Sequence, residues 1–512
     1  MKKNTKSVYK IFALAILILF VTLSVNAQET PIKNSYHFTL ENGLELFVME
    51  NHSVPLTYIE IAVRAGGIAQ NKENAGLFHL YEHMMFKGNA QYQTAADIQK
   101  ALKDLGIANW NGSTAAEHVN YFFTIPSDLT EKGLQFWSSA MQTPLLDPIE
   151  MENEKKVVIS EISGGYTDPN TIYSMATEKA LFPKYPWRLD PAGPVKNVEN
   201  ATIEQLKEIQ HTYYIPNNSA LFVGGDVDHT EIYKMVKKIY GNWKKGANPW
   251  AGKRDFQLAI PFEKSQYLVM PHSQISPQVA QVTVTFRGPD TAIDTDSTYA
   301  ADVFTNLSQN PTGLIKKSFM AVPELKIPSP EYISSGYYTQ REGGEIYFQA
   351  LMLSPEQSIG QRAQLFQNII QTKVVNGIIN DKNYFKTEEY QNVKQRLKDS
   401  DLYTTETASG FLSNLRFWWT VSSTDYYFGY NDKMSAVNST DVANFTQKYL
   451  EKKPALVTVL VNPAVYEAQK DEFEAAGFTT ITAENAFWWK DIVDADTISN
   501  LSKNSVEGTN ND

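Results

Sequence analysis

The pattern of apolar and polar positions predicts β-strands near the start of the chain. Residues 57–63 alternate between apolar and polar side chains, as is typical of a β-strand. Before them, two apolar segments, 36–40 and 44–49, are joined by Glu41-Asn42-Gly43. An Asn-Gly pair tolerates positive φ at both positions, so this junction predicts a β-hairpin with a type I′ turn.

Helical patterns follow these strands. Helices are expected over about 94–105 and 128–141, with a strand at 120–125 between them. Another helix begins after Asp147, because Asp147 is a good N-cap, Pro148 suits the first helical position and Glu150 completes a capping box. A buried strand near 220–223 and an amphipathic helix ending near Tyr240 complete the first half.

The second half repeats this order in outline. Strands are expected at 281–286, 346–353 and 455–461, and helices at 297–307, 357–375 and 384–398. The similarity of Tyr213 and 220–223 to Tyr449 and 455–458 is a weak sign of duplication. Residues 246–262 between the halves are polar and contain Gly and Pro, which indicates a linker.

Composition restricts the possible functions. The chain has 512 residues, 42% of them hydrophobic, so it is folded and long enough for two cores. A net charge of −11 argues against a nucleic-acid-binding protein. The absence of cysteine excludes disulfides, thiol catalysis and Cys-ligated zinc. Residues 491–512 are acidic and rich in Ser and Asn, and we expect a disordered tail.

The first 27 residues have the features of a secretory signal peptide. Four lysines (Lys2, Lys3, Lys6 and Lys10) precede an apolar stretch, which ends at the small-residue site Val25-Asn26-Ala27. An uncleaved anchor is the alternative, although the apolar run is short for a bilayer span. We expect the mature chain (28–512) to be exported, to be periplasmic or extracellular, and to have no membrane span.

The clearest chemical signal is His79-Leu80-Tyr81-Glu82-His83. On a helix, His79 and His83 lie one turn apart on one face with Glu82 beside them. Two imidazoles in this arrangement can bind one metal ion, and a nearby carboxylate can accept a proton from water. The order H-x-x-E-H is the inverzincin pattern. The alternative is two structural histidines in a packed helix.

The helix that begins at Pro148 carries a candidate for a third ligand. Glu154 and Glu161 share a face with Val157 and Val158, whereas Glu152, Lys155 and Lys156 point the other way. A carboxylate buried among valines requires compensation, which a divalent metal would provide. We predict Glu161 as the third ligand and Glu154 as a neighbouring group that orients the site. The alternative is a buried glutamate paired with Lys or Arg.

With these residues in view, the chain resembles the insulinase/pitrilysin family of zinc peptidases, especially the shorter two-domain members related to mitochondrial processing peptidase. The similarity extends from about Tyr36 to Tyr466, with residues 79–88 following the family motif H-x-x-E-H-M-x-F-K-G and residues 154–161 matching the helix that completes the zinc site. Residues 111–121 resemble a stretch that forms an edge strand for substrate, with Gly112 in place of Ala and Val119 in place of the second Thr, which makes Asn111, Ser113 and Thr114 candidate substrate contacts.

The resemblance implies the fold, the cofactor and the reaction. The expected fold is α+β, with two similar domains (33–245 and 263–490), each a mixed β-sheet backed by helices, that together form half of a clamshell. It implies Zn²⁺ held by His79, His83 and Glu161, with Glu82 as the base in the hydrolysis of short or unfolded peptides.

The resemblance also implies a second chain that completes the chamber. Relatives carry an Arg and a Tyr in the second half, and the corresponding run here, 313–323, has neither. Arg341, Tyr337, Tyr338 and Tyr347 are possible replacements. The gap favours a heterodimer with a related chain, and the alternatives are a homodimer and a chain with low activity.

Two other functions compete with a peptidase. One is a non-catalytic assembly subunit, and the other is a metal-storage or sensing module. The remaining histidines have no partner at metal-ligand spacing and are interpreted as structural or surface residues: His37, His52, His118, His211, His229 and His272. Of these, His118 lies near the expected edge strand.

Overall fold

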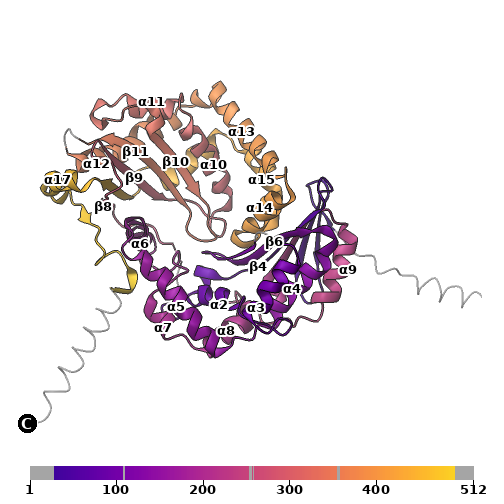
Figure 1. The fold of residues 1–512 in the computed structure, drawn as a ribbon. Coiled ribbons are helices and arrows are strands. Elements are labelled where there is room, and N and C mark those ends of the chain that lie inside the picture. Colours follow the sequence, from indigo (N-terminus) through magenta and orange to yellow (C-terminus); the bar gives the residue numbers. More distant parts are fainter. Residues whose placement is uncertain (1–27, 108–109, 253–256, 258, 355–357, 491–512) are drawn as a thin grey trace, which may run out of the picture.

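The structure is a computed structural model that describes residues 28–107, 110–252, 257, 259–354 and 358–490. The predicted signal peptide (1–27) and tail (491–512) lie outside the described residues, as do 253–256 and 258 of the predicted linker. Two lobes, each a β-sheet with helices, make up the described chain (Figure 1). In this part of the chain, no helix combines the length and hydropathy that crossing a bilayer requires.

Each lobe contains one mixed sheet, and the two sheets share a topology. The first has the order β1 (Gln28–Glu29), β2 (Ser35–Thr39), β3 (Glu45–Glu50), β7 (Ser219–Gly225), β4 (Leu56–Val63), β6 (Val119–Pro126), β5 (Trp110–Thr114). The second has the order β10 (Ile333–Tyr338), β11 (Glu345–Leu353), β9 (Val279–Arg287), β12 (Leu456–Val461), β8 (Gln266–Pro271), β13 (Thr479–Thr480).

The shared topology confirms the predicted α+β fold of two similar domains. Strands β3 to β7 occupy, in chain order, the same places as β8 to β12, and each set has one parallel pair, β3 with β7 and β12 with β8. Strands β7 and β12, which carry the similarity noted around 220–223 and 455–458, are therefore equivalent. The proposed domain limits, 33–245 and 263–490, enclose both sheets apart from β1.

Helices cover one face of each sheet. In the first domain they are α2 (Leu77–Met84), α3 (Ala95–Asp104), α4 (Thr130–Gln142), α5 (Pro148–Gly165), α7 (Val195–Glu199), α8 (Ile203–Tyr213) and α9 (His229–Tyr240). In the second domain they are α10 (Thr295–Gln309), α11 (Leu314–Met320), α12 (Ile359–Ile369), a π-helix (Ile370–Ile379), α13 (Glu388–Thr404), α15 (Thr424–Ala436), α16 (Ser439–Tyr449) and α17 (Pro463–Ala475).

The two domains exchange one helix each. Helix α6 (Pro169–Leu181) leaves the first domain and packs on β12, whereas α14 (Ala408–Val421) leaves the second and packs on β7, β3 and β4. Apolar side chains of α14 form a core with Phe47 and Phe222 on the face of the first sheet that its own helices leave uncovered. The first sheet is therefore buried on both faces, and the second domain supplies one of the covers.

Most of the predicted elements are present within a few residues of their expected limits, and two differ. The type I′ turn is wrong: among residues 41–43 only Gly43 has positive φ (+86°), and Gly43 N donates to Leu40 O. This is the three-residue hairpin loop with a left-handed glycine. The helix expected over 357–375 is α12 followed by the π-helical segment. The sequence patterns do not predict strands β1, β8, β10 and β13, or helices α6, α7, α8, α11 and α14 to α17.

Candidate metal centre

Helix α2 carries the H-x-x-E-H motif. Leu77, Leu80, Tyr81 and Met84 are buried in the first-domain core, as the pattern predicts, so the opposite face presents His79 and His83. The helix begins after Gly76, whose φ is +94° and where a Cβ would lie 2.4 Å from the Ala192 carbonyl oxygen. Only glycine meets both conditions without strain, so this residue sets where the helix starts.

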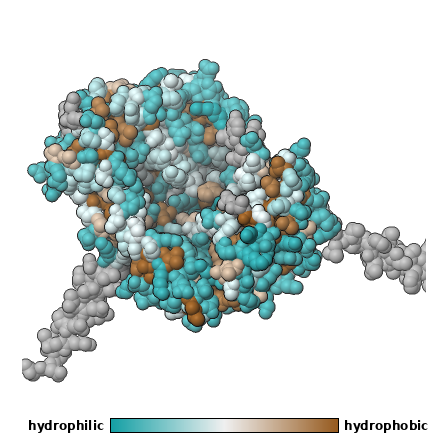
Figure 2. All heavy atoms as spheres, viewed as in Figure 1, coloured by the Kyte–Doolittle hydropathy of each residue, from teal (hydrophilic) through white to brown (hydrophobic). Residues whose placement is uncertain are grey.

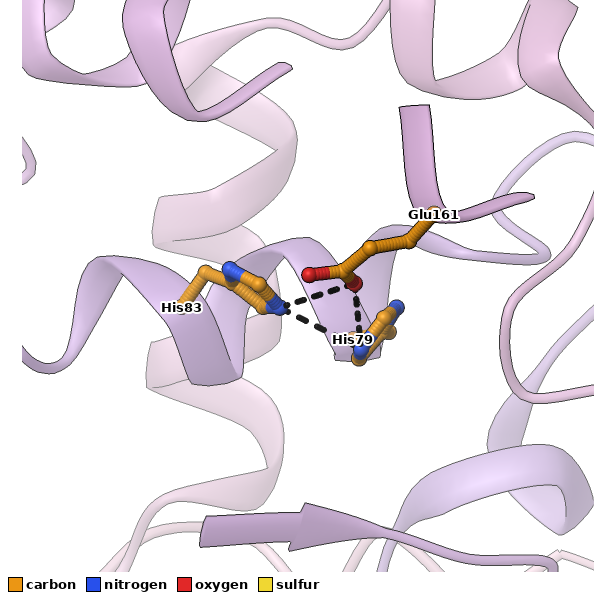
Figure 3. A group of neighbouring side chains, drawn as sticks. All are labelled: His79, His83 and Glu161. Atoms are coloured by element: carbon orange, nitrogen blue, oxygen red, sulfur yellow. Dashed lines mark hydrogen bonds and ion pairs between the residues drawn. The ribbon is translucent and has the colours of Figure 1, made fainter. Parts of the chain in front are cut away.

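Three potential ligand atoms converge from two helices. The Nε2 atoms of His79 and His83 are 3.3 Å apart, and Oε2 of Glu161 on α5 lies 3.9 Å from the first and 3.6 Å from the second (Figure 3). Tetrahedral ligand atoms on zinc are about 3.3–3.4 Å apart, given bonds of about 2.0–2.1 Å. The observed spacings are equal to this or longer by up to about half an ångström, so small side-chain movements would let the three residues hold a zinc ion.

Glu154 orients one of the two histidines. Nδ1 of His83 donates to Glu154 Oε2 over 3.0 Å, which leaves the Nε2 lone pair directed at His79 and Glu161. Burial alone would raise the pKa of Glu154, but hydrogen bonds from His83 and Lys87 outweigh burial and lower it. The carboxylate is therefore held ionised. Lys87 was not predicted as a site residue, although its i+4 spacing from His83 is a local signal.

The histidines differ in their protonation. Burial and the neighbouring His83 lower the pKa of His79 to about 4, so this imidazole is neutral near pH 7 and can bind a metal. For His83, burial acts downward, but the hydrogen bond to Glu154 and the charge of Glu161 raise its pKa above the ordinary value. A proton therefore competes for His83 more strongly than for His79.

Glu82 lies beside this group and against strand β5. Thr114 Oγ1 donates to Glu82 Oε2 over 2.9 Å, and a Cβ on Gly112 would lie 2.8 Å from Oε1. Burial raises the pKa of Glu82, and the Thr114 hydrogen bond opposes the rise. A carboxylate with a raised pKa is suited to accept and return a proton near neutral pH.

Helix α5 is rotated relative to the sequence prediction. Glu161, expected to be buried, has a half-exposed side chain, and Val157 is exposed. Lys155, expected to face water, is buried, and its Nζ donates to Glu152 Oε1 and to the Glu199 carbonyl oxygen. Burying Lys155 is acceptable because both bonds satisfy its charge. Burial among valines is therefore the wrong reason for choosing Glu161, although the residue lies at the predicted place.

Strand β5 places the other candidates at the edge of the sheet. It is the last strand in the order, and no described strand pairs with its outer side. Asn111 and Ser113 are exposed, whereas Thr114 contacts Glu82. The outer backbone of this strand can therefore accept another extended segment within reach of the candidate base.

The possible replacements for the missing Arg and Tyr have other contacts. Tyr337 Oη donates to the Pro289 carbonyl oxygen, and the rings of Tyr338 and Tyr347 stack. The backbone N of Arg341 donates to Glu117, and its guanidinium lies over the Trp250 ring. None of these contacts joins the residues to the metal centre.

The second domain has no equivalent centre among the described residues. Its counterpart of α2 is α10, where Asp302 accepts a hydrogen bond from Tyr430. The other His/carboxylate group in the described chain, formed by Glu50, Asp228 and His229, is explained by an ion pair and by the N-cap of α9.

Comparison with known families and proteins agrees with this picture. A family model for the insulinase peptidases (peptidase family M16) matches residues 46–189, and a model for the M16 inactive domain matches residues 200–318. The β subunit of mitochondrial-processing peptidase from Dictyostelium discoideum is 24% identical over 206 residues, which is 40% of this chain and 44% of that protein. The zinc protease PqqE of Helicobacter pylori is 25% identical over 232 residues, 44% of this chain and 51% of that protein.

Solved structures share the fold over most of the chain. The first half of the periplasmic protease PqqL from Escherichia coli has a TM-score of 0.70 at 17% identity. The alignment covers 88% of this chain and 97% of the PqqL chain. A protease from Helicobacter pylori has a TM-score of 0.65 at 17% identity, and the alignment covers 84% of this chain and 100% of the protease chain. The aligned region spans about half the length of the two curated relatives above.

Proposed function

The chain belongs to peptidase family M16, the insulinase family, and we propose that it is an exported zinc endopeptidase that hydrolyses short or unfolded peptides. The observation that carries the proposal is the convergence of His79, His83 and Glu161 beside Glu82. A storage or sensing site would need ligands but no adjacent proton acceptor, and Glu82 supplies one.

The residues divide the reaction between them. His79, His83 and Glu161 hold Zn²⁺, which when bound supplies a Lewis acid that polarises the scissile carbonyl and acidifies water. Glu82 accepts the proton of the attacking water and returns it to the nitrogen of the leaving amine, so the peptide and one water become an acid and an amine. Gly112 leaves space next to Glu82 Oε1 for these groups. Thr114 fixes the other oxygen.

The outer edge of β5 binds the substrate backbone. An extended peptide can add as a further strand beyond Asn111, Ser113 and Thr114, and its main chain then passes Glu82. A folded protein lacks a free extended segment of this kind. The preference for short or unfolded peptides follows from this mode of binding.

A second M16-type chain completes the active site. This chain contributes two domains, and a hollow opens between its lobes (Figure 2). No Arg or Tyr occurs in the run 313–323, and the nearby candidates have other contacts. We favour a heterodimer whose partner supplies both groups, with a homodimer as the alternative. The similarity to a periplasmic protease supports export to the periplasm or the exterior.

The test separates metal binding from turnover. Wild type and Glu82→Gln are assayed for zinc content and for cleavage of fluorogenic peptides, alone and with a related chain that has Arg and Tyr but no H-x-x-E-H. We expect both proteins to bind one zinc and only wild type to cleave. Near wild-type cleavage by the variant would remove Glu82 from its role. Zinc binding without cleavage in every mixture would favour the non-catalytic subunit.

A further inference from the structure

The hairpin that joins β5 to β6 is held on several sides. Its tip, residues 115–118, receives backbone hydrogen bonds from Gly67 and Ile68 to the carbonyls of Ala115 and Ala116. Arg188, which follows α6, donates to the Ala116 carbonyl and pairs with Glu117. Strand β5 therefore ends in a turn that is hydrogen-bonded to several other segments.

The second domain contributes a further contact through α14. Arg416 Nη1 donates to His118 Nε2 over 2.6 Å, and Arg416 Nε lies 2.8 Å from Glu60 Oε1. Glu60 lies on β4 with no exposed surface and also accepts from Tyr58 Oη and Asn120 Nδ2. Burial and the adjacent guanidinium lower the pKa of His118 to about 3, so its ring is neutral and can accept the hydrogen bond.

His118 is linked to the candidate base by a short stretch of backbone. Its carbonyl accepts from Ala115 N, which closes the turn, and the next residue back is Thr114, whose hydroxyl holds Glu82. The pairing of Thr114 with Val119 and of Ser113 with Asn120 extends from this point. A displacement of His118 therefore moves the end of β5 that contacts Glu82.

We propose that Arg416 and His118 are positioning residues through which the second domain sets strand β5 against Glu82. The catalytic consequence rests on the proposed function. The contact between Arg416 and His118, and its effect on strand β5, can be measured without that function. This contact gives the second domain, which has no metal centre of its own in the described chain, a direct role in the first domain's site.

The test breaks the link at His118, so that Arg416 and Glu60 stay paired and no charge is left buried alone. His118→Leu removes the acceptor at similar volume, and His118→Gln restores an acceptor near the Nε2 position. Arg64→Met is the control, because Arg64 also joins the first sheet to α14, and its side chain donates to the Trp419 carbonyl and not to His118. If His118→Leu has a much lower melting temperature than wild type, the double variant Arg416→Gln with Glu60→Gln is the second test.

Amide hydrogen exchange over residues 110–126 measures directly how far the contact between Arg416 and His118 stabilises strands β5 and β6. We expect faster exchange there in His118→Leu, by about tenfold or more, and near wild-type exchange in His118→Gln and Arg64→Met. Zinc content stays at one per chain. Unchanged exchange in His118→Leu, or an equal increase in Arg64→Met, would overturn the proposal, even if the enzyme is active. Absence of peptidase activity in wild type would instead overturn the proposed function.

Kinetics then test the path through Thr114. We expect kcat/KM to fall about tenfold or more in His118→Leu and to recover in His118→Gln. Thr114→Val combined with His118→Leu should cost no more than the larger single effect, because both act through the same strand. Additive losses would show that His118 acts elsewhere and would contradict the positioning role.

Discussion

At the scale of single residues, Glu154 affects zinc affinity because it orients His83. It accepts from His83 Nδ1 and pairs with Lys87, so it fixes the ring that presents Nε2 to the metal. We expect Glu154→Gln to weaken zinc affinity by about 10–100-fold, since carboxylates that orient ligand histidines have effects of this size. Competition with a chelator measures it. Glu208→Gln on the exposed side of α8 is the control and should leave affinity unchanged.

The raised pKa of His83 predicts how zinc binding depends on pH. A histidine binds metal only when neutral, so affinity is full above the pKa of His83 and falls as pH falls through it. Because this pKa lies above 6.5, the loss begins at a higher pH than for an ordinary histidine, whereas His79 contributes a loss only near pH 4. Zinc dissociation constants measured from pH 8 to pH 5 test this. Constant affinity down to pH 6 would contradict it.

At this scale the sequence predicts where the candidate ligands lie better than it predicts which side chains are buried. His79, His83 and Glu82 share one helix, so their relative placement follows from local geometry. The buried face of α5 does not follow, because Lys155 is buried through bonds to Glu152 and the Glu199 carbonyl that lie outside any helical pattern. A charged side chain with satisfied hydrogen bonds can replace an apolar one on a buried face, and the sequence alone does not show which one does.

At the scale of elements, the exchanged helix α14 is part of the first domain's core. Leu415 is fully buried there against the first sheet. We expect Leu415→Ala to lower the free energy of unfolding by about 2–5 kcal/mol, the usual cost of a buried Leu→Ala change. The loss should appear in hydrogen exchange of β3 and β7, which belong to the other domain. Leu314→Ala, at an exposed leucine of α11, should change stability by less than about 0.5 kcal/mol.

Helix α14 also explains why the burial of strand β4 on both faces does not follow from its sequence pattern, although the strand itself was predicted. The alternation in 57–63 is typical of a half-buried strand. In the structure α14 covers the face that this pattern leaves exposed, and Glu60 is buried with Arg416 as its partner. The partner lies more than 350 residues away in the chain, so no local pattern can identify it. Contacts between distant segments are the part of this fold that the sequence pattern leaves undetermined.

At the scale of the whole molecule, the helix exchange makes the domains interdependent. Residues 28–252 alone would expose the face of the first sheet that carries Phe47, Ala62 and Phe222, because α14 is absent. An apolar surface of this kind promotes aggregation. We expect this fragment to bind a hydrophobic dye and to aggregate, whereas the full chain stays soluble. Co-expression with residues 259–490 should restore solubility and zinc binding together. A monomeric, dye-silent fragment would show that the first domain folds without its exchanged helix, and that the second domain is dispensable for its stability.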